Sequence, residues 1–224
     1  MPSIVSVVGK SKVGKTTFIE KLVPELQRRG YRLGTIKHDA HDHADIDHPG
    51  KDSWRHRQAG AQTVALSSPS RIALIKEVPE ELDLDSIVAM YFQDEDLVLT
   101  EGYKGSNKAK IEIFRSEVHE ELLCTPADRL LAVVSDVSLP VEVPCFDLED
   151  VAGVASLLEE RFLRAASDTT MIVRLDGKRL PMKSFVRDFV VGGITGMLSA
   201  LRGYRTPSRI DIAIRLPKQQ REST

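Results

Sequence analysis

The stretch Gly9-Lys10-Ser11-Lys12-Val13-Gly14-Lys15-Thr16 fits the phosphate-binding pattern G-x-x-x-x-G-K-[ST]. An apolar run, Ile4 to Val8, precedes it, and the segment that follows, as far as Leu26, carries apolar side chains at helical spacing. In a strand, loop and helix of this kind, the backbone N–H groups of the loop converge on phosphate oxygens, and the positive end of the helix adds to their field. The stretch therefore predicts a phosphate-binding loop.

Within this loop, two side chains have expected roles in binding a nucleoside triphosphate. We expect Lys15 to reach the β- and γ-phosphates and the Thr16 hydroxyl to ligate Mg²⁺. The predicted nucleotide-binding residues of this region are Gly9, Lys10, Ser11, Lys12, Val13, Gly14, Lys15, Thr16 and Thr17.

The rest of the chain alternates predicted strands and helices. Strands are expected near 31–36, 63–66, 71–76, 96–100, 110–114 and 130–134, and helices near 15–29, 54–60, 84–92 and 151–163. This alternation predicts an α/β fold of the P-loop NTPase type, a mostly parallel sheet with helices on both faces. A hydrophobic content of 42% and a net charge of -2, with no long apolar segment or leader, favour a cytoplasmic protein without a membrane or nucleic-acid partner.

Small and polar residues between about 165 and 170 predict a domain boundary, which divides the chain into a P-loop domain, 1–165, and an extension, 168–224. A hairpin around Asp176-Gly177, a helix near 185–201 and an alternating strand near 209–215 make the extension ββαβ. It carries 11 Lys or Arg against 5 Asp or Glu, so its partner is either an anionic ligand or the acidic body of the same chain.

Catalysis by a nucleotide hydrolase requires an acid beside Mg²⁺ and a loop that senses the γ-phosphate. Glu101 follows an apolar strand at its carboxyl end, whereas Asp96 stands at the opposite end, so Glu101 is the preferred acid. A solvated loop glutamate is the alternative interpretation. Asp52 and Ser53, after Gly50-Lys51, are the candidate switch element.

Residues 37–53 are predicted to form a polar loop with four histidines, His38, His41, His43 and His48. Imidazoles and carboxylates suit several metals, but this spacing matches no closed zinc pattern, and the two cysteines, Cys124 and Cys145, are remote. Asp136 follows a strand where a guanine-reading aspartate would lie, although the usual accompanying Asn and Lys are missing. From these residues alone, the nucleotide base stays open.

Taken together, these motifs resemble the molybdopterin-guanine dinucleotide biosynthesis protein B family, MobB. The resemblance covers about 2–165 and depends on the phosphate loop and on five further segments. They are Ile36-Lys37-His38, Asp47-His48-Pro49-Gly50-Lys51-Asp52-Ser53 with Arg57-Gln58-Ala59-Gly60-Ala61, Glu101-Gly102-Tyr103-Lys104, and Lys110-Ile111-Glu112.

The resemblance implies a GTP-binding protein with weak hydrolysis that assists the enzyme attaching GMP to molybdopterin in molybdenum cofactor biosynthesis. It implies that 1–165 binds Mg²⁺-GTP with Glu101 near the metal, and that molybdopterin is a possible further ligand. His38, Asp52 and Ser53 would line the nucleotide or cofactor face. Members of this family are typically homodimers.

Two alternatives depart from that interpretation. A metallochaperone-type GTPase would carry its metal on the histidine-rich loop. A deviant Walker A ATPase would use Lys10, which stands where such proteins place a signature lysine that reaches phosphates across a dimer. The expected absence of an arginine finger in cis favours slow hydrolysis, with Arg55 and Arg57 as the nearest candidates for one.

Overall fold

The computed structural model describes residues 2–39, 47–164, 171, 173–175, 178–180, 182–207 and 210–214. The chain divides into two compact units, 1–170 and 171–224. The boundary predicted between 165 and 168 lies outside the described residues, so its exact position stays a prediction.

The first unit is built on a six-stranded sheet in which every neighbouring pair is parallel. The strands, in sheet order, are β2 (Leu33–Lys37), β5 (Leu97–Glu101), β1 (Ser3–Val8), β6 (Ala109–Phe114), β7 (Leu130–Ser135) and β8 (Cys145–Asp147). The predicted α/β fold of the P-loop NTPase type is confirmed. The edge strand β8 was not predicted, because three residues carry no periodic signal.

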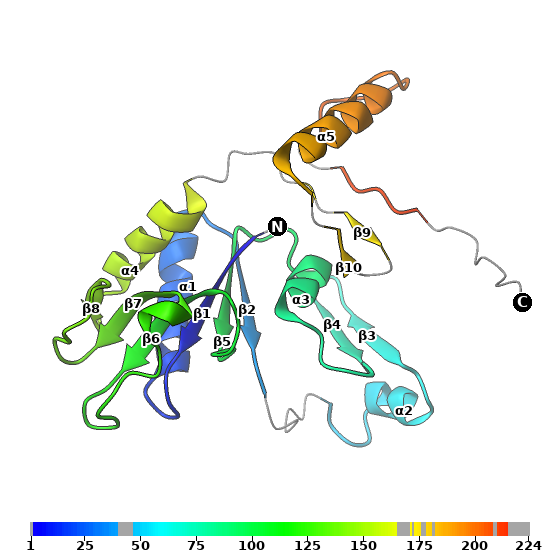
Figure 1. The fold of residues 1–224 in the computed structure, drawn as a ribbon. Coiled ribbons are helices and arrows are strands. Elements are labelled where there is room, and N and C mark those ends of the chain that lie inside the picture. The colour runs from blue at the N-terminus through cyan, green and yellow to red at the C-terminus, as the bar shows by residue number, and fades with distance from the viewer. Residues whose placement is uncertain are drawn as a thin grey trace, which may run out of the picture. The chain divides into compact units, whose positions relative to one another are not determined.

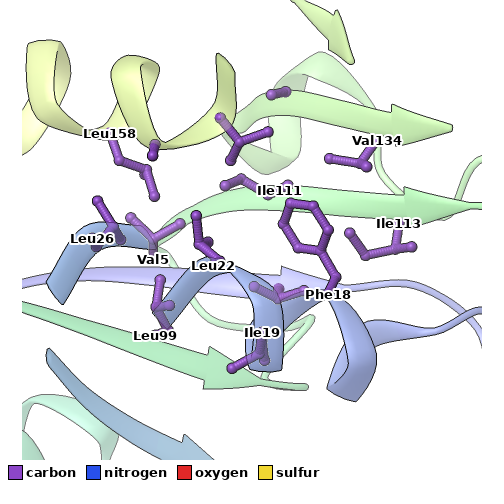
Figure 2. Packing of buried hydrophobic residues seen from close by; sticks show 14 of the residues in the cluster. Val5, Phe18, Ile19, Leu22, Leu26, Leu99, Ile111, Ile113, Val134 and Leu158 are labelled. Atoms are coloured by element: carbon purple, nitrogen blue, oxygen red, sulfur yellow. The ribbon is translucent and has the colours of Figure 1, made fainter. Parts of the chain in front are cut away.

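One face of this sheet is covered by α1 (Lys15–Arg28) and α4 (Val151–Leu158), and α4 continues as a π-helical turn, Glu159–Leu163 (Figure 1). Figure 2 shows Phe18, Leu22 and Leu26 of α1 packed on the sheet beside Leu158 of α4. These leucines have no exposed surface, and burial of each stabilises the fold by about 1.5–3 kcal/mol. This packing fixes α1, and with it the end of the phosphate loop.

The other face of the sheet is covered by α3 (Leu84–Tyr91). Leu84 and Val88 of α3 pack against Ile4 and Val98 of the sheet. Helices therefore lie on both faces, as predicted. A single turn of 3₁₀ helix, Pro126–Asp128, precedes β7.

The strands β3 (Thr63–Ser67) and β4 (Ile72–Lys76) pair antiparallel with each other in a separate two-stranded sheet. Their connection is four residues long, which suits a hairpin and is too short for a parallel crossover. Beside β3 lies α2 (Asp52–Gln58), which begins two residues earlier than predicted. The assignment of Asp52 and Ser53 to a loop was wrong: both stand in the first helical turn.

The second unit contains a short antiparallel hairpin, β9 (Arg174–Leu175) with β10 (Lys178–Arg179), followed by α5 (Ser184–Ser199). The final strand predicted near 209–215 is wrong for its described part, since residues 210–214 belong to no strand. Ile212 and Ile214 are 54% and 80% exposed, so the alternating pattern there has no buried face to stabilise a strand. Across the described ranges of both units, no helix is long and apolar enough to span a membrane.

Candidate functional site

The phosphate loop connects the carboxyl end of β1 to the start of α1, and its two glycines are required by geometry. A Cβ atom on Gly9 would lie 2.5 Å from the backbone oxygen of Ile113 in β6, closer than any real side chain approaches. Gly14 has a φ of 98°, in the left-handed region, immediately before α1. Residues with side chains at these positions would displace the loop.

Lys15 folds back over its own loop. Its Nζ donates to the backbone oxygens of Gly9 at 3.0 Å and Lys10 at 2.7 Å. Burial lowers the pKa of Lys15; the nearby Lys37 lowers it further, and Glu101 opposes the shift. The ammonium group is thus held at the centre of the loop, where a phosphate oxygen can replace the carbonyl acceptors.

The Thr16 hydroxyl donates to Glu101 Oε2 at 2.9 Å, which joins the first turn of α1 to the end of β5. The Glu101 side chain is 17% exposed, and Lys37 Nζ lies 3.9 Å from its Oε1. Neighbouring ligands of an octahedral Mg²⁺ also lie about 2.9 Å apart, given bonds of about 2.0–2.1 Å. The predicted metal-binding pair is therefore brought together at a spacing that fits Mg²⁺.

Beside the loop lies a cavity of about 1030 Å³, at the carboxyl ends of β1, β2 and β5. Such a position at the strand ends is where open α/β sheets bind ligands. Its lining comes from the phosphate loop and three other segments, and consists of Val8, Gly9, Ser11, Lys15, His38, Asp39, Glu81, Leu82, Asp83, Leu84, Asp85, Glu101, Gly102, Tyr103, Lys104, Gly105, Ser106, Asn107 and Lys108.

An aromatic pair lines this cavity away from the phosphate loop. The rings of His38 and Tyr103 are stacked, with centroids 4.4 Å apart and planes inclined by 28°, and His38 Nε2 lies 2.8 Å from Glu81 Oε1. Tyr103 has a φ of 55°, directly after Gly102 at 95°, so a left-handed turn aims its ring at His38. Burial raises the pKa of the Tyr103 phenol, and the Glu81 charge adds to this, so the phenol keeps its proton.

The loop that carries Tyr103 is held in place by two lysines, the buried Lys110 and the partly exposed Lys108. Lys110, only 2% exposed, donates from Nζ to the backbone oxygens of Ser106, Lys108 and Asp128 at 2.6, 3.3 and 2.8 Å. Lys108 in turn contacts both carboxylate oxygens of Asp85 at 2.7 Å. A buried cation that satisfies three carbonyls fixes this wall of the cavity.

On the other side of the phosphate loop, polar side chains bond to neighbouring chain segments. Asp136 accepts from Ser116 N at 2.9 Å and from Ser116 Oγ at 3.2 Å, and it does not line the cavity. Arg115 Nε donates to the backbone oxygen of Val13 at 3.1 Å. Asp136, the residue predicted to recognise guanine, follows β7, which lies two strands from β1 in the sheet. Both of its carboxylate oxygens already accept hydrogen bonds from Ser116.

The predicted switch residues do not line the cavity. Ser53 donates to Asp47 Oδ1 at 3.0 Å, and Asp52 lies 3.6 Å from Arg55. Arg57 lies 3.5 Å from the Asp47 carboxylate. Among the predicted nucleotide-binding residues of the phosphate-loop region, Lys10, Lys12 and Thr17 are exposed, and Val13 is buried beneath the loop.

Some cavity residues were not predicted from the sequence. Tyr103 lies in the segment Glu101-Gly102-Tyr103-Lys104, but the sequence assigns it no role, and nothing in the sequence around Glu81 signals that it approaches His38. Of the histidine-rich loop, His41 and His43 lie outside the described residues. Within the described ranges, no group of three or more His, Cys, Asp or Glu side chains could hold a metal ion.

A parallel sheet with a phosphate loop after β1, and an acid at the end of the adjacent β5, defines an α/β protein of the P-loop NTPase type. Residues 4–136 match the family model described as Molybdopterin guanine dinucleotide synthesis protein B, MobB. The chain belongs to this family.

Known relatives agree with this membership. A protein of Escherichia coli K12 named molybdopterin-guanine dinucleotide biosynthesis adapter protein is 45% identical over 157 residues, which cover 67% of this chain and 87% of that protein. A Haemophilus influenzae protein of the same name is 34% identical over 70% of this chain and 87% of its own length. A crystal structure of molybdopterin-guanine biosynthesis protein B, 33% identical, matches 72% of this chain and 99% of its own with a TM-score of 0.56.

Proposed function

We propose that this chain is a GTP-binding adapter in the synthesis of molybdopterin guanine dinucleotide. It assists the enzyme that attaches GMP to molybdopterin. Membership of the MobB family and the adapter names of two relatives support the pathway. The observation that carries nucleotide binding is the 2.9 Å contact between Thr16 and Glu101, made beside a loop with Lys15 at its centre.

In this proposal, the loop N–H groups and Lys15 bind the β- and γ-phosphates. The Thr16 hydroxyl and the Glu101 carboxylate hold Mg²⁺, which neutralises phosphate charge. Because a phosphate is a stronger acceptor for an ammonium group than a carbonyl, we expect Lys15 to exchange its bonds to Gly9 and Lys10 for phosphate oxygens.

Weak hydrolysis is part of the same proposal. The cavity lining, as far as the described residues define it, contains no arginine, and Arg115, beside the phosphate loop, donates from Nε to the backbone oxygen of Val13. Arg55 and Arg57, the candidates from the sequence, pair with carboxylates beside α2 instead. An arginine finger accelerates hydrolysis by about 10³ to 10⁵, so we expect slow turnover without one, as suits an adapter.

Two further expectations belong to this proposal. Molybdopterin is the second ligand, and the working form is a homodimer. The adapter presents nucleotide to the GMP-transferring enzyme rather than consuming it, so GMP transfer is the activity to measure.

The test compares Lys15→Ala with Lys21→Ala, which removes a lysine of the same helix whose ammonium contacts Glu149 at 2.6 Å. We expect Lys15→Ala to weaken Mg²⁺-GTP binding in calorimetry by about 30-fold, since a charged hydrogen-bonding group is worth about 1.5–3 kcal/mol. Stimulation of GMP transfer by the partner enzyme should fall with it. Lys21→Ala should change neither.

Three results would contradict the proposal: equal GTP affinity for both variants, tighter binding of ATP than of GTP, or hydrolysis by the isolated protein well above about 1 s⁻¹, a rate typical of full enzymes.

A further inference from the structure

The sheet order separates the surroundings of the phosphate loop into two sides. β5 and β2 lie on one side of β1, and β6 and β7 lie on the other. Segments after β2 and β5 contribute to the cavity, whereas Ser116 and Asp136 follow β6 and β7. A nucleotide with its phosphates at Lys15 and its base toward Asp136 would leave most of the cavity free.

The size of the cavity agrees with a second occupant. Its volume of about 1030 Å³ lies just above the range of about 300–1,000 Å³ for small-molecule sites. The phosphate loop contributes only one edge of the lining, through Gly9, Ser11 and Lys15. The remainder is formed by the segments around His38, 81–85 and 101–108.

The side chains in the part of the cavity away from the phosphate loop suit a flat ring with hydrogen-bond donors. His38 and Tyr103 already form a stack at 4.4 Å, and both line the cavity, so a third ring can extend the stack. Glu81 Oε1 contacts His38, while the Glu81 side chain is 68% exposed and able to accept further bonds. The cavity-lining Lys104 is exposed and, within the described ranges, forms no ion pair, so it is available to an anion.

We propose that the part of the cavity formed by His38, Tyr103 and Glu81 binds a pterin ring while nucleotide occupies the phosphate loop. This inference rests on the proposed function, which makes a pterin the acceptor of GMP. It adds the location of the acceptor, the residues that bind it and the simultaneous occupancy of both ligands.

A pterin matches these groups one by one. Its planar bicyclic ring stacks on an aromatic side chain, as nucleic-acid bases of similar size do. The ring N–H and the 2-amino group lie on one edge and donate in parallel, which a carboxylate such as Glu81 accepts. A phosphate on the pterin side chain would be met by Lys104. Guanine presents the same donor edge, so the test must separate the two rings.

The experiment measures neopterin fluorescence during titration with the full-length protein, with and without saturating Mg²⁺ and a non-hydrolysable GTP analogue. We expect neopterin to bind equally well in both conditions. Tyr103→Leu and Glu81→Gln should each weaken it by about 10-fold, because each removes one stacking or charged hydrogen-bond partner. Tyr103→Phe, which keeps the ring, should restore binding.

Glu80→Gln is the matched control, since Glu80 is exposed, adjacent in sequence and absent from the cavity lining. It should bind neopterin as the unmodified chain does. For neopterin monophosphate, Lys104→Ala should remove the gain in affinity that the phosphate brings. Circular dichroism of every variant checks that the fold is retained.

Several outcomes would overturn the inference: no fluorescence change at millimolar protein, displacement of neopterin by the GTP analogue, equal displacement by guanosine, or equal effects of Glu80→Gln and Glu81→Gln. Should neopterin fail to bind while GTP binding and GMP-transfer stimulation still depend on Lys15, only this inference fails and the proposed function stands.

Discussion

Carboxylates on the two sides of the phosphate loop differ in the capacity they keep for a ligand, and Glu112 and Glu81 show the difference most clearly. On the β6/β7 side, Asp136 accepts two bonds from Ser116, and the buried Glu112 accepts from the N–H groups of Leu123 and Cys124 at 2.6 and 2.9 Å. On the β2/β5 side, carboxylates and rings line a cavity of about 1030 Å³.

The difference teaches that residue type alone does not mark a ligand site. A buried carboxylate with two N–H donors is already satisfied, and a ligand would have to replace those bonds at a cost of about 1–3 kcal/mol each. A partly exposed carboxylate beside a cavity has capacity left. The predictions below test whether the β6/β7 side is as closed as its hydrogen bonds indicate.

The largest expected effect concerns the two cysteines. Burial raises the pKa of the Cys124 thiol to about 12, and the Glu112 charge adds to the shift, whereas Cys145 is exposed. At pH 8, about one Cys124 in 10⁴ would be a thiolate, the form that reacts. Iodoacetamide followed by mass spectrometry should label Cys145 first and Cys124 only on unfolding.

The same shift has a consequence for stability. A thiol whose pKa is raised by folding contributes stability that is complete below the unfolded pKa of about 8.5 and is lost as pH rises toward 12. The free energy of unfolding should therefore decline above about pH 9, and a Cys124→Ala variant should lose part of that decline. Rapid labelling of Cys124 in the folded protein would show that the β6/β7 side opens readily.

The next effect is on stability, through Glu112. Glu112→Gln replaces one carboxylate oxygen by an NH₂ group, which faces the N–H of Leu123 or Cys124 and cannot accept from it. We expect urea denaturation to show a loss of about 2 kcal/mol in the free energy of unfolding. Glu120→Gln, an exposed change in the loop between β6 and Leu123, should cost less than about 0.5 kcal/mol. Equal losses would remove the distinction between satisfied and solvated carboxylates.

The smallest effect tests base recognition at Asp136. If this carboxylate leaves Ser116 to bind guanine, Asp136→Asn should reduce the preference for GTP over ATP by about 10-fold, the value of one charged hydrogen bond. Ser116→Ala keeps the carboxylate and removes the Oγ contact, so it should preserve that preference. Competition binding with both nucleotides measures each ratio. An unchanged ratio in Asp136→Asn would place base recognition elsewhere.

Much of the fold could be predicted because its signals are local. The apolar run before Gly9 and the helical spacing after Lys15 are visible within about 25 residues, and the observed β1 and α1 differ from the prediction by one residue at an end. The β3–β4 hairpin and the unpaired 210–214 could not be predicted in this way. Whether an apolar strand joins the main sheet, another strand or none depends on partners distant in sequence.

The features of the site also divide into those with a local sequence signal and those that depend on residues distant in sequence. The sequence by itself determined the phosphate loop, with Lys15 and Thr16 in it, and the place of Glu101 at the end of a strand, because glycine geometry and strand-end position are local properties. Only the tertiary structure decided which other polar groups face the cavity. It placed Glu81 beside His38 and Tyr103, and it assigned Ser53 to Asp47 and Asp136 to Ser116. Hydrogen bonds between segments settle which carboxylates are satisfied and which still have bonds to offer a ligand.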